Sequence, residues 1–303
     1  MTTFYSKSYP SKVLLYGEYT IIEQGAALAI PYPTLAGRWQ RLSSNNSIAT
    51  ASHQSLLVIL SFLQKSTLDF LNLDAFAIDL EQGIWFDSNI PGGYGLGSSG
   101  AVCAAIYDRY CLQKTTNWQE LQSKLAAIEN CFHGRSSGID PLVSYLQQPL
   151  LITADGDIQQ VDLPLANTPT GGGLFLLDTQ LERQATAFIN FFVNAAKQSD
   201  FQKSYIAPAK QAAQQAIAAL IEPQPSQLLT ATKQLSALQY QHLSPMVPEH
   251  FSHIWEQGLD TQAYSIKLCG AGGGGFLLGA TADWEATKNK YLKNNNVTLI
   301  YSW

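Results

Sequence analysis

The residues of this chain best suited to chemistry form a loop rich in glycine and serine at 91–101, with the sequence Pro-Gly-Gly-Tyr-Gly-Leu-Gly-Ser-Ser-Gly-Ala. An apolar run at 84–86 precedes it as an expected strand, and helix-forming residues follow from Ala101. Glycines let backbone N–H groups converge on an anion, and a helix N-terminus adds free N–H groups and the positive end of its dipole. The loop therefore predicts a phosphate site, although a plain strand–helix turn with serine caps fits this run alone equally well.

Two familiar phosphate motifs overlap the loop, and both fit it badly. Gly92 and Gly97 have the spacing of a Walker A motif, but Ser98 stands where that motif has its lysine. Residues 95–100 formally match the dinucleotide fingerprint, in which the strand runs straight into the first glycine. Here Pro91 and two further glycines intervene, and a proline interrupts strand hydrogen bonding. An NAD-dependent oxidoreductase therefore stays only as an outside alternative.

Three further segments carry residues of the same chemistry. They read PSKVLLYGEY at 10–19, ENCFHGRSSGID at 129–140 and KLCGAGGGGF at 267–276. In this order and spacing, together with the glycine loop, they resemble the motifs of the GHMP kinases, the superfamily of galactokinase, homoserine kinase, mevalonate kinase and phosphomevalonate kinase. The resemblance covers nearly the whole chain, and its mid-chain and C-terminal segments are most similar to mevalonate kinase.

The resemblance implies a fold and a set of ligands. It implies an α+β protein with an N-terminal ATP-binding domain at 1–168, which contains a left-handed βαβ unit, and a ferredoxin-like domain with inserted helices at 169–303. It also implies ATP and Mg²⁺ as cofactors and a small alcohol as substrate. The expected ATP-binding residues are Pro91, Gly93, Gly95, Leu96, Gly97, Ser98, Ser99 and Gly100.

Phosphoryl transfer needs positioning, charge neutralisation and an acceptor oxygen ready to lose its proton. Asp140 is the candidate base, and Lys12 would stabilise the acceptor oxygen and the neighbouring carboxylate. By resemblance, Ser99 and Glu129 would hold the magnesium ion, for which oxygen ligands are suitable. The expected substrate-binding residues are Glu18, Tyr19, Ser137, Gly138, Ala271 and Gly272.

Each of these residues also has an ordinary structural interpretation. Asp140 before Pro141 fits a helix cap, Lys12 and Glu129 fit exposed positions, and Gly272–Gly275 fits a tight hairpin. A GHMP-fold protein that binds a ligand without catalysis is thus a further alternative. The joint presence of Lys12, Ser99, Glu129 and Asp140 favours an active kinase.

The substrate is less sharply indicated than the reaction. Tyr19 stands where mevalonate kinases usually have histidine, and this variant is more similar to bacterial phosphomevalonate kinases. Ser136 and Pro141 replace the usual proline and asparagine of the mid-chain motif. We expect mevalonate, converted to 5-phosphomevalonate in the isoprenoid precursor pathway. Phosphomevalonate is the second choice, and homoserine or a sugar the third.

The elements that must position these residues follow from periodicity. The patterns predict strands at 12–16, 26–30, 75–80, 84–86, 174–177, 265–269, 276–279 and 297–303. They predict helices at 53–71, 101–112, 118–132, 182–198, 204–222, 225–242, 247–259 and 284–294. Without its middle helices, the second half has the βαββαβ order of a ferredoxin-like fold.

Composition narrows the class of protein. Among 303 residues, 46% are hydrophobic, only 14% are charged and the net charge is -5, so we expect a packed globular protein without a nucleic-acid surface. The N-terminus lacks a signal pattern and no apolar stretch is long enough to span a membrane, which predicts a cytoplasmic protein without a membrane partner. The four cysteines and five histidines lack zinc-type spacing. The oligomeric state is not indicated, and a homodimer stays open.

Overall fold

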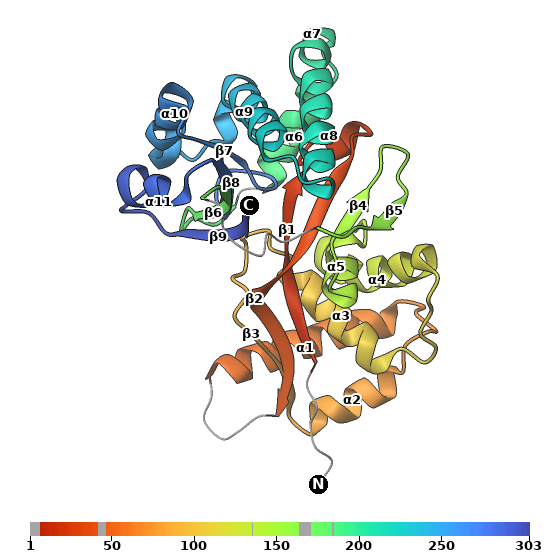
Figure 1. The fold of residues 1–303 in the computed structure, drawn as a ribbon. Helices are drawn as coiled ribbons and strands as arrows, with labels where there is room; N and C mark the ends of the chain where they lie inside the picture. Colours follow the sequence, from red (N-terminus) through yellow and green to blue (C-terminus); the bar gives the residue numbers. More distant parts are fainter. Residues whose placement is uncertain (1–6, 42–46, 135, 164–170, 184) are drawn as a thin grey trace. The chain divides into compact units, whose positions relative to one another are not determined.

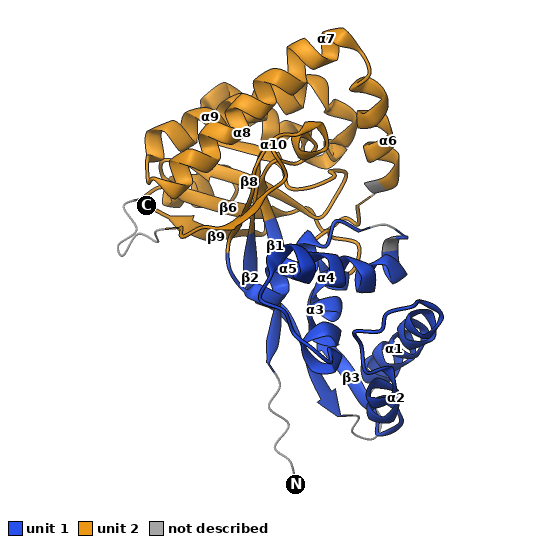
Figure 2. Cartoon of the chain, turned by 90° about the vertical axis from the view of Figure 1, so that its right-hand side faces the viewer, with its two compact units in different colours: residues 1–13, 30–91, 96–148 blue, residues 14–29, 92–95, 149–303 orange. Residues whose placement is uncertain are grey.

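The structure is a computed structural model that describes residues 7–41, 47–134, 136–163, 171–183 and 185–303. Contacts divide the chain into two compact units, coloured separately in Figure 2. Unit 1 comprises residues 1–13, 30–91 and 96–148, and unit 2 comprises residues 14–29, 92–95 and 149–303. The predicted domain boundary at 168/169 falls within 164–170, outside the described residues.

Two strands contribute to both units. They are β1 (Ser8–Tyr16) and β2 (Ala27–Arg41). In unit 1, β2 pairs antiparallel with β3 (Ile84–Ser88), from Gly37 opposite Ser88 to Arg41 opposite Ile84. In unit 2, a 3₁₀ turn η1 (Thr20–Glu23) joins β1 to β2, which pairs with β4 (Leu150–Ile152), and β4 pairs with β5 (Ile158–Gln160).

The helices of unit 1 cover an aromatic core. They are α1 (Ser47–Lys65), α2 (Leu73–Glu81), α3 (Ser98–Tyr110), α4 (Trp118–His133) and α5 (Ile139–Leu146). The rings of Trp39, Phe76, Phe86 and Tyr110 lie in contact, with centroids between 4.6 and 6.4 Å apart. Gly37 makes room for this cluster, since a Cβ there would lie 2.1 Å from Cε1 of Phe86.

The predicted strand at 75–80 was wrong, because this segment is helix α2. The side chain of Asn72 accepts a hydrogen bond from the N–H of Ala75 at 3.0 Å and so caps the helix. Phe76 and Leu80, four residues apart, are the buried residues of the helix. Residues 75–80 therefore fit a helical stripe as well as the alternation of a strand. The helix predicted at 53–71 begins earlier, at Ser47, and ends earlier, at Lys65.

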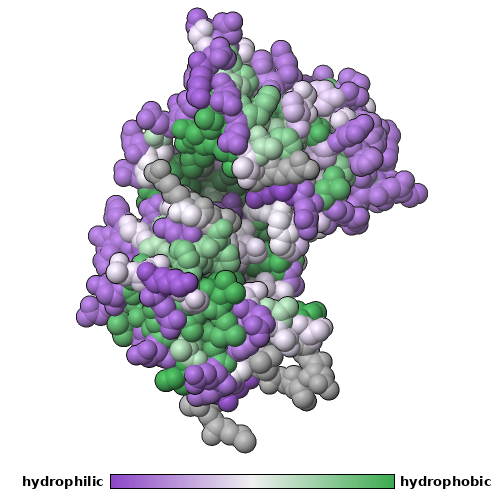
Figure 3. Space-filling model, turned by 180° about the vertical axis from the view of Figure 1, so that it is seen from behind, coloured by the Kyte–Doolittle hydropathy of each residue, from purple (hydrophilic) through white to green (hydrophobic). Residues whose placement is uncertain are grey.

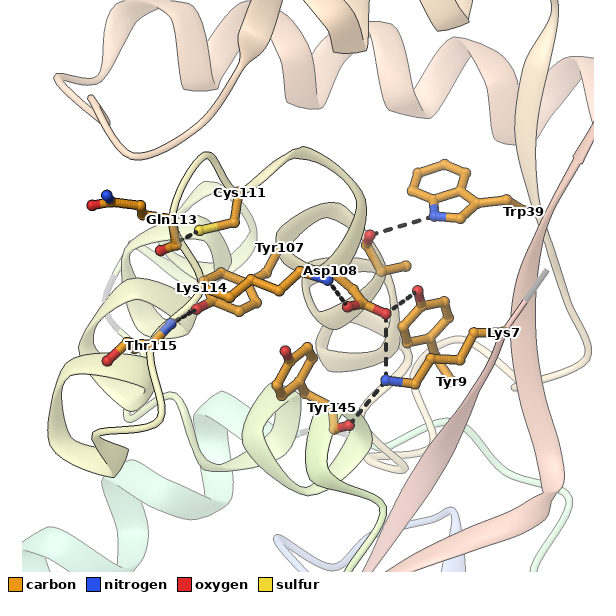
Figure 4. A network of polar contacts seen from close by, with 11 residues as sticks. Lys7, Tyr9, Trp39, Tyr107, Asp108, Cys111, Gln113, Lys114, Thr115 and Tyr145 are labelled. Carbon is orange, nitrogen blue, oxygen red and sulfur yellow. Dashed lines mark hydrogen bonds and ion pairs between the residues drawn. The ribbon is translucent and has the colours of Figure 1, made fainter. Parts of the chain in front are cut away.

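A polar network in unit 1 holds the start of β1 against α3 and α5 (Figure 4). Asp108 on α3 accepts a hydrogen bond from the hydroxyl of Tyr9 at 2.9 Å and pairs with Lys114 and Lys7 at 2.5 and 3.3 Å. Lys7 also lies over the ring of Tyr145 on α5, 4.7 Å from its centroid. Burial opposes ionisation of the Asp108 carboxyl, but its lysine and tyrosine partners hold the pKa of the group below its usual value. The network therefore fixes the strand that carries Lys12.

The second sheet of the fold lies in unit 2. Its order is β7-β8-β6-β9, all antiparallel, formed by β6 (Gly173–Asp178), β7 (Tyr264–Leu268), β8 (Phe276–Thr281) and β9 (Val297–Ser302). The two strands of each β-helix-β unit thus have a third strand between them, as in a split βαβ fold. The predicted ferredoxin-like order is confirmed.

Helices occupy the long connection between β6 and β7 (Figure 1). The α-helices there are α6 (Ala185–Ala195), α7 (Ser199–Phe201), α8 (Ala207–Ile221), α9 (Pro225–His242) and α10 (Ser252–Thr261). Shorter turns are the π-helix η2 (Gln202–Ile206) and the 3₁₀ helices η3 (Ser244–Met246) and η4 (Glu249–Phe251). Between β8 and β9 lie α11 (Trp284–Ala286) and a π-helical turn, η5 (Thr287–Tyr291). These ranges confirm the inserted helices predicted from the sequence.

The surface carries some apolar area, seen in green in Figure 3. Its large exposed hydrophobic residues include Ile48, Val58 and Phe62 on α1 and Ile78 on α2. Among the described residues, no helix is both long enough and apolar enough to cross a membrane.

Candidate active site

The predicted phosphate loop enters helix α3 through a series of left-handed glycines. Gly93, Gly95 and Gly97 have φ angles of 74°, 70° and 70°, a region that side chains with a Cβ disfavour. Gly97 is the N-cap of α3 and, as a glycine, has no side chain with which to cap the helix. The N–H groups of its first turn, at residues 98–100, are therefore presented at the positive end of the helix dipole, which favours an anion.

Lys12 and Asp140 meet beside this helix N-terminus, within unit 1. The Lys12 Nζ lies 3.0 Å from Oδ1 of Asp140, and the side chains are 13% and 32% exposed. The backbone N–H of Lys12 donates to the carbonyl of Leu96 at 2.8 Å, which ties β1 to the loop. A Cβ on Gly97 would lie 3.2 Å from Cγ of Lys12 and 3.4 Å from Oδ2 of Asp140. The cap of α5 is Gly138, so Asp140 is free of the capping role that its sequence context also fitted.

Gly100 allows α3 to pack closely on the start of α5. A Cβ there would lie 2.8 Å from both the carbonyl carbon of Asp140 and the nitrogen of Pro141. Backbone atoms are the obstacle, so no side-chain rotation would relieve the clash. The position of Asp140 relative to the first turn of α3 therefore depends on the absence of a side chain at residue 100.

Ser99 and Glu129, the two predicted metal ligands, are in contact. The Ser99 hydroxyl donates to Oε1 of Glu129 at 3.0 Å, and Glu129 on α4 is only 4% exposed. The other carboxylate oxygen accepts a hydrogen bond from Ser136, whose hydroxyl in turn accepts from the N–H of Gly138 at 2.9 Å. Ser136, which stands where related motifs have proline, therefore fixes both Glu129 and the turn before α5.

The chemistry of this donor set fits magnesium, because hydroxyl and carboxylate oxygens are its preferred ligands. Within the described ranges, no group of three or more His, Cys, Asp or Glu side chains is arranged to hold a metal ion. An ion at Ser99 and Glu129 would thus take its other ligands from phosphate and water.

The remaining unit 1 residues of the predicted site line the turn before α5. The carbonyl of Ser137 accepts a hydrogen bond from the side chain of Gln122 at 2.7 Å. Gly138 has a φ of 74°, and a Cβ there would lie 2.5 Å from the carbonyl oxygen of Gln122. Arg135 in the same turn lies outside the described residues.

Glu18, predicted to bind substrate, belongs to a buried polar cluster in unit 2. Its Oε1 pairs with Lys267 Nζ at 2.8 Å and accepts a hydrogen bond from Gln239, and the Glu18 and Lys267 side chains are 2% and 0% exposed. Lys267 also donates to the carbonyls of Leu15 and Leu268, at 3.0 and 2.6 Å. Burial raises the pKa of Glu18, and the Lys267 charge opposes this rise. The cluster joins the end of β1 to the end of β7, where the second glycine loop begins.

Tyr19, Ala271 and Gly272 also come together in unit 2. The Tyr19 hydroxyl donates to the carbonyl of Ala271, and its ring lies 4.7 Å from that of Phe192. Gly272 packs against Met246, whose Cβ would lie 2.9 Å from a Cβ on the glycine. The structure therefore brings these three predicted substrate-binding residues to one place, the turn after β7.

Arg183 follows β6 and contacts both glycine loops within unit 2. The backbone N–H of Arg183 donates a hydrogen bond to the carbonyl of Gly93 at 3.0 Å. The guanidinium covers Gly95, since a Cβ there would lie 1.6 Å from its Cζ, and a Cβ on Gly270 would lie 2.5 Å from its Nη1. A planar cation is thus held against residues 93–95 and 270.

Several of these contacts were not predicted from the sequence. Lys267 and Gln239 were not selected as members of a site, and Ser136 was treated only as a departure from a motif. A lysine on a largely apolar strand is the one signal that pointed to Lys267, because an isolated ammonium in a core requires a partner. Gln239 lies on a polar helix and gave no such signal.

Comparison with known proteins gives the class of this fold. Residues 58–148 match the family model described as the GHMP kinases N terminal domain. No curated protein matches the chain by sequence. A crystal structure of L. major mevalonate kinase in complex with R-mevalonate is similar over 97% of this chain and 94% of that one, with 16% identity and a TM-score of 0.66.

Other solved structures with this fold act on different substrates. Streptococcus pneumoniae phosphomevalonate kinase, in complex with phosphomevalonate and AMPPNP, is similar over 98% of this chain and 99% of that one, with 16% identity and a TM-score of 0.63. Lactococcus lactis galactokinase, complexed with galactose, is similar over 99% of this chain and 94% of that one, with 13% identity and a TM-score of 0.63. The chain has the fold of these GHMP kinases, and residues 58–148 match the model of that family's N-terminal domain.

Proposed function

We propose that the protein is an ATP-dependent kinase that phosphorylates the hydroxyl group of a small alcohol. The observation that carries this proposal is the ion pair of Lys12 with Asp140 beside the uncapped N-terminus of α3. A helix N-terminus, a lysine and a carboxylate are the groups that phosphoryl transfer to an alcohol requires. The Ser99–Glu129 pair adds oxygen ligands for magnesium next to the same helix.

In this proposed reaction each of these residues has a defined chemical role. The Asp140 carboxylate accepts the proton of the acceptor hydroxyl, and Lys12 stabilises the negative charge that develops on that oxygen. The acceptor oxygen forms a bond to the γ-phosphorus of ATP while the bond from that phosphorus to the β–γ bridging oxygen breaks, so ADP leaves. The N–H groups of residues 98–100 bind phosphate oxygens. Magnesium at Ser99 and Glu129 would neutralise phosphate charge.

Mevalonate is the acceptor that we propose first. The basis is the likeness of the segments at 133–140 and 267–275 to mevalonate kinase motifs, and a fold shared with an enzyme solved in complex with R-mevalonate. Phosphomevalonate is the second candidate, and one observation favours it. Arg183 holds a guanidinium against Gly95 and Gly270, where it would pair with the extra negative charge of a phosphorylated acceptor.

Steady-state kinetics with mevalonate, phosphomevalonate, homoserine and galactose test the proposal, with ADP release as the readout. We expect the highest kcat/KM with mevalonate. Asp140→Asn and Lys12→Met should each lower kcat by about 10²–10⁴-fold, the contribution of a positioned base, with little change in ATP affinity. Asp69→Asn, which changes an exposed aspartate of unit 1, is the matched control and should keep full turnover.

Two outcomes would change these assignments. Near-wild-type turnover in Asp140→Asn would remove the base from the mechanism. A preference for phosphomevalonate of about tenfold or more, abolished in Arg183→Ala, would correct the acceptor and leave the kinase assignment intact.

A further inference from the structure

Unit 2 contains a cavity that is formed by residues which the proposed function does not use. It has a volume of about 530 Å³, within the range of small-molecule sites. One wall comes from η4 and the first turns of α10, with His250 and His253. The other wall comes from the π-helical turn η5 and the residues after it, with Lys290, Tyr291 and Lys293.

The charges that line this cavity all have one sign. It gathers two lysines and two of the five histidines of a chain whose net charge is -5, and its lining has no acidic residue. Among the described residues, none of these four side chains forms an ion pair, and Lys290 instead lies over the ring of Tyr291, 4.8 Å from the centroid. Glu256 on α10 is bound by the hydroxyl of Tyr240. Two lysine ammonium groups with no acidic residue in the lining favour an anionic ligand.

The walls of the cavity are fixed by contacts beneath them. The hydroxyl of Tyr264 on β7 donates to the carbonyl of Ile254 at 2.7 Å and lies 3.2 Å from Oε1 of Gln257, so it ties α10 to the sheet. The ring of Tyr264 also lies 5.8 Å from that of Tyr291. Lys290 and Tyr291 belong to a π-helical turn, a rare feature that occurs often at functional sites.

We propose that this cavity binds a phosphorylated ligand that carries two or more negative charges. The ammonium groups of Lys290 and Lys293 and the imidazoles of His250 and His253 would bind its phosphate oxygens from two sides, with the amides of Gln257 and Asn294 as neutral donors. The site uses none of the residues at 91–100, 129 or 140, so it is separate from the proposed catalytic groups.

Inorganic pyrophosphate is a suitable probe, with binding measured by calorimetry on the full chain. We expect saturable binding by the wild type and binding about tenfold weaker or more in the double variant Lys290→Gln/Lys293→Gln. Lys288→Gln is the control, because it removes one positive charge from η5 at a residue outside the cavity lining, and the single variant Lys290→Gln is its match within the lining. Lys288→Gln should bind pyrophosphate like the wild type. His250→Gln/His253→Gln removes the donors of the other wall and should also weaken binding.

If pyrophosphate binds at the proposed nucleotide site instead, its affinity should be the same in the lining variants and in the control variant. Failure of this inference can therefore be distinguished from failure of the proposed function. Equal affinities in the lining and control variants, or no saturable binding by the wild type, would overturn the inference.

Discussion

Glu129 shows how one side chain in this protein depends on its immediate partners. Its carboxylate is almost fully buried, which is costly unless its oxygens are bonded. The hydroxyls of Ser99 and Ser136 each donate to one of these oxygens. These two hydroxyl groups hold the carboxylate and its charge in position.

Replacing Glu129 by glutamine removes that charge and keeps the shape. We expect Glu129→Gln to raise the magnesium concentration required for half-maximal activity by about tenfold or more, since a ligand carboxylate would be lost. Activity titrated with magnesium at fixed ATP measures this. Glu81→Gln, on the exposed end of α2, should leave the titration unchanged. An unchanged magnesium requirement in Glu129→Gln would exclude this residue as a ligand.

At the scale of elements, α3 is the centre of the proposed site. Its N-terminus carries the proposed phosphate donors and Ser99. Its third residue, Gly100, allows it to pack closely on α5. The Lys12 N–H on β1 is bonded to Leu96, directly before the helix. The base, the lysine and the phosphate donors are thus positioned by one helix and the two elements that contact it.

The glycines at 92 and 100 allow this packing to be tested. Gly100→Ala should destabilise the protein by about 1–3 kcal/mol through overpacking, and should lower kcat because Asp140 must shift. At Gly92 a Cβ would have no heavy atom within 4 Å, so Gly92→Ala is the matched control. Thermal unfolding and kcat of both variants give the comparison. If Gly100→Ala unfolds at the wild-type temperature with full kcat, the close contact of α3 with α5 contributes neither to stability nor to the position of Asp140.

For the whole molecule, nucleotide should act as a stabilising ligand. ATP with magnesium should raise the melting temperature as its concentration increases, because it binds the folded state only, and NAD should not. Thermal shifts measured in parallel with both nucleotides decide between the kinase and the oxidoreductase. A shift with NAD and none with ATP would revive the dinucleotide interpretation of residues 95–100.

Much of this molecule could be predicted because its motifs and periodicities are local. The glycine loop, the βαββαβ order and the inserted helices all depend on residues close together in the chain. The strand β2 was predicted too short, at 26–30, because Pro31 and Pro33 interrupt its pattern. The Glu18–Lys267–Gln239 cluster was missed because its members are far apart in sequence and meet only in the folded core.

The path of the chain through the first glycine loop has a consequence for synthesis of the protein. Residues 92–95 belong to unit 2, where Gly93 is bonded to Arg183 and the carbonyl of Tyr94 lies against Gly275. On the ribosome these partners emerge long after the loop itself, since domains form from the N-terminus onward. The first half of the loop can therefore form its native contacts only after nearly the complete polypeptide has been synthesised. A nascent or C-terminally shortened chain therefore has the motif without the contacts to Arg183 and Gly275 that accompany it in the folded protein.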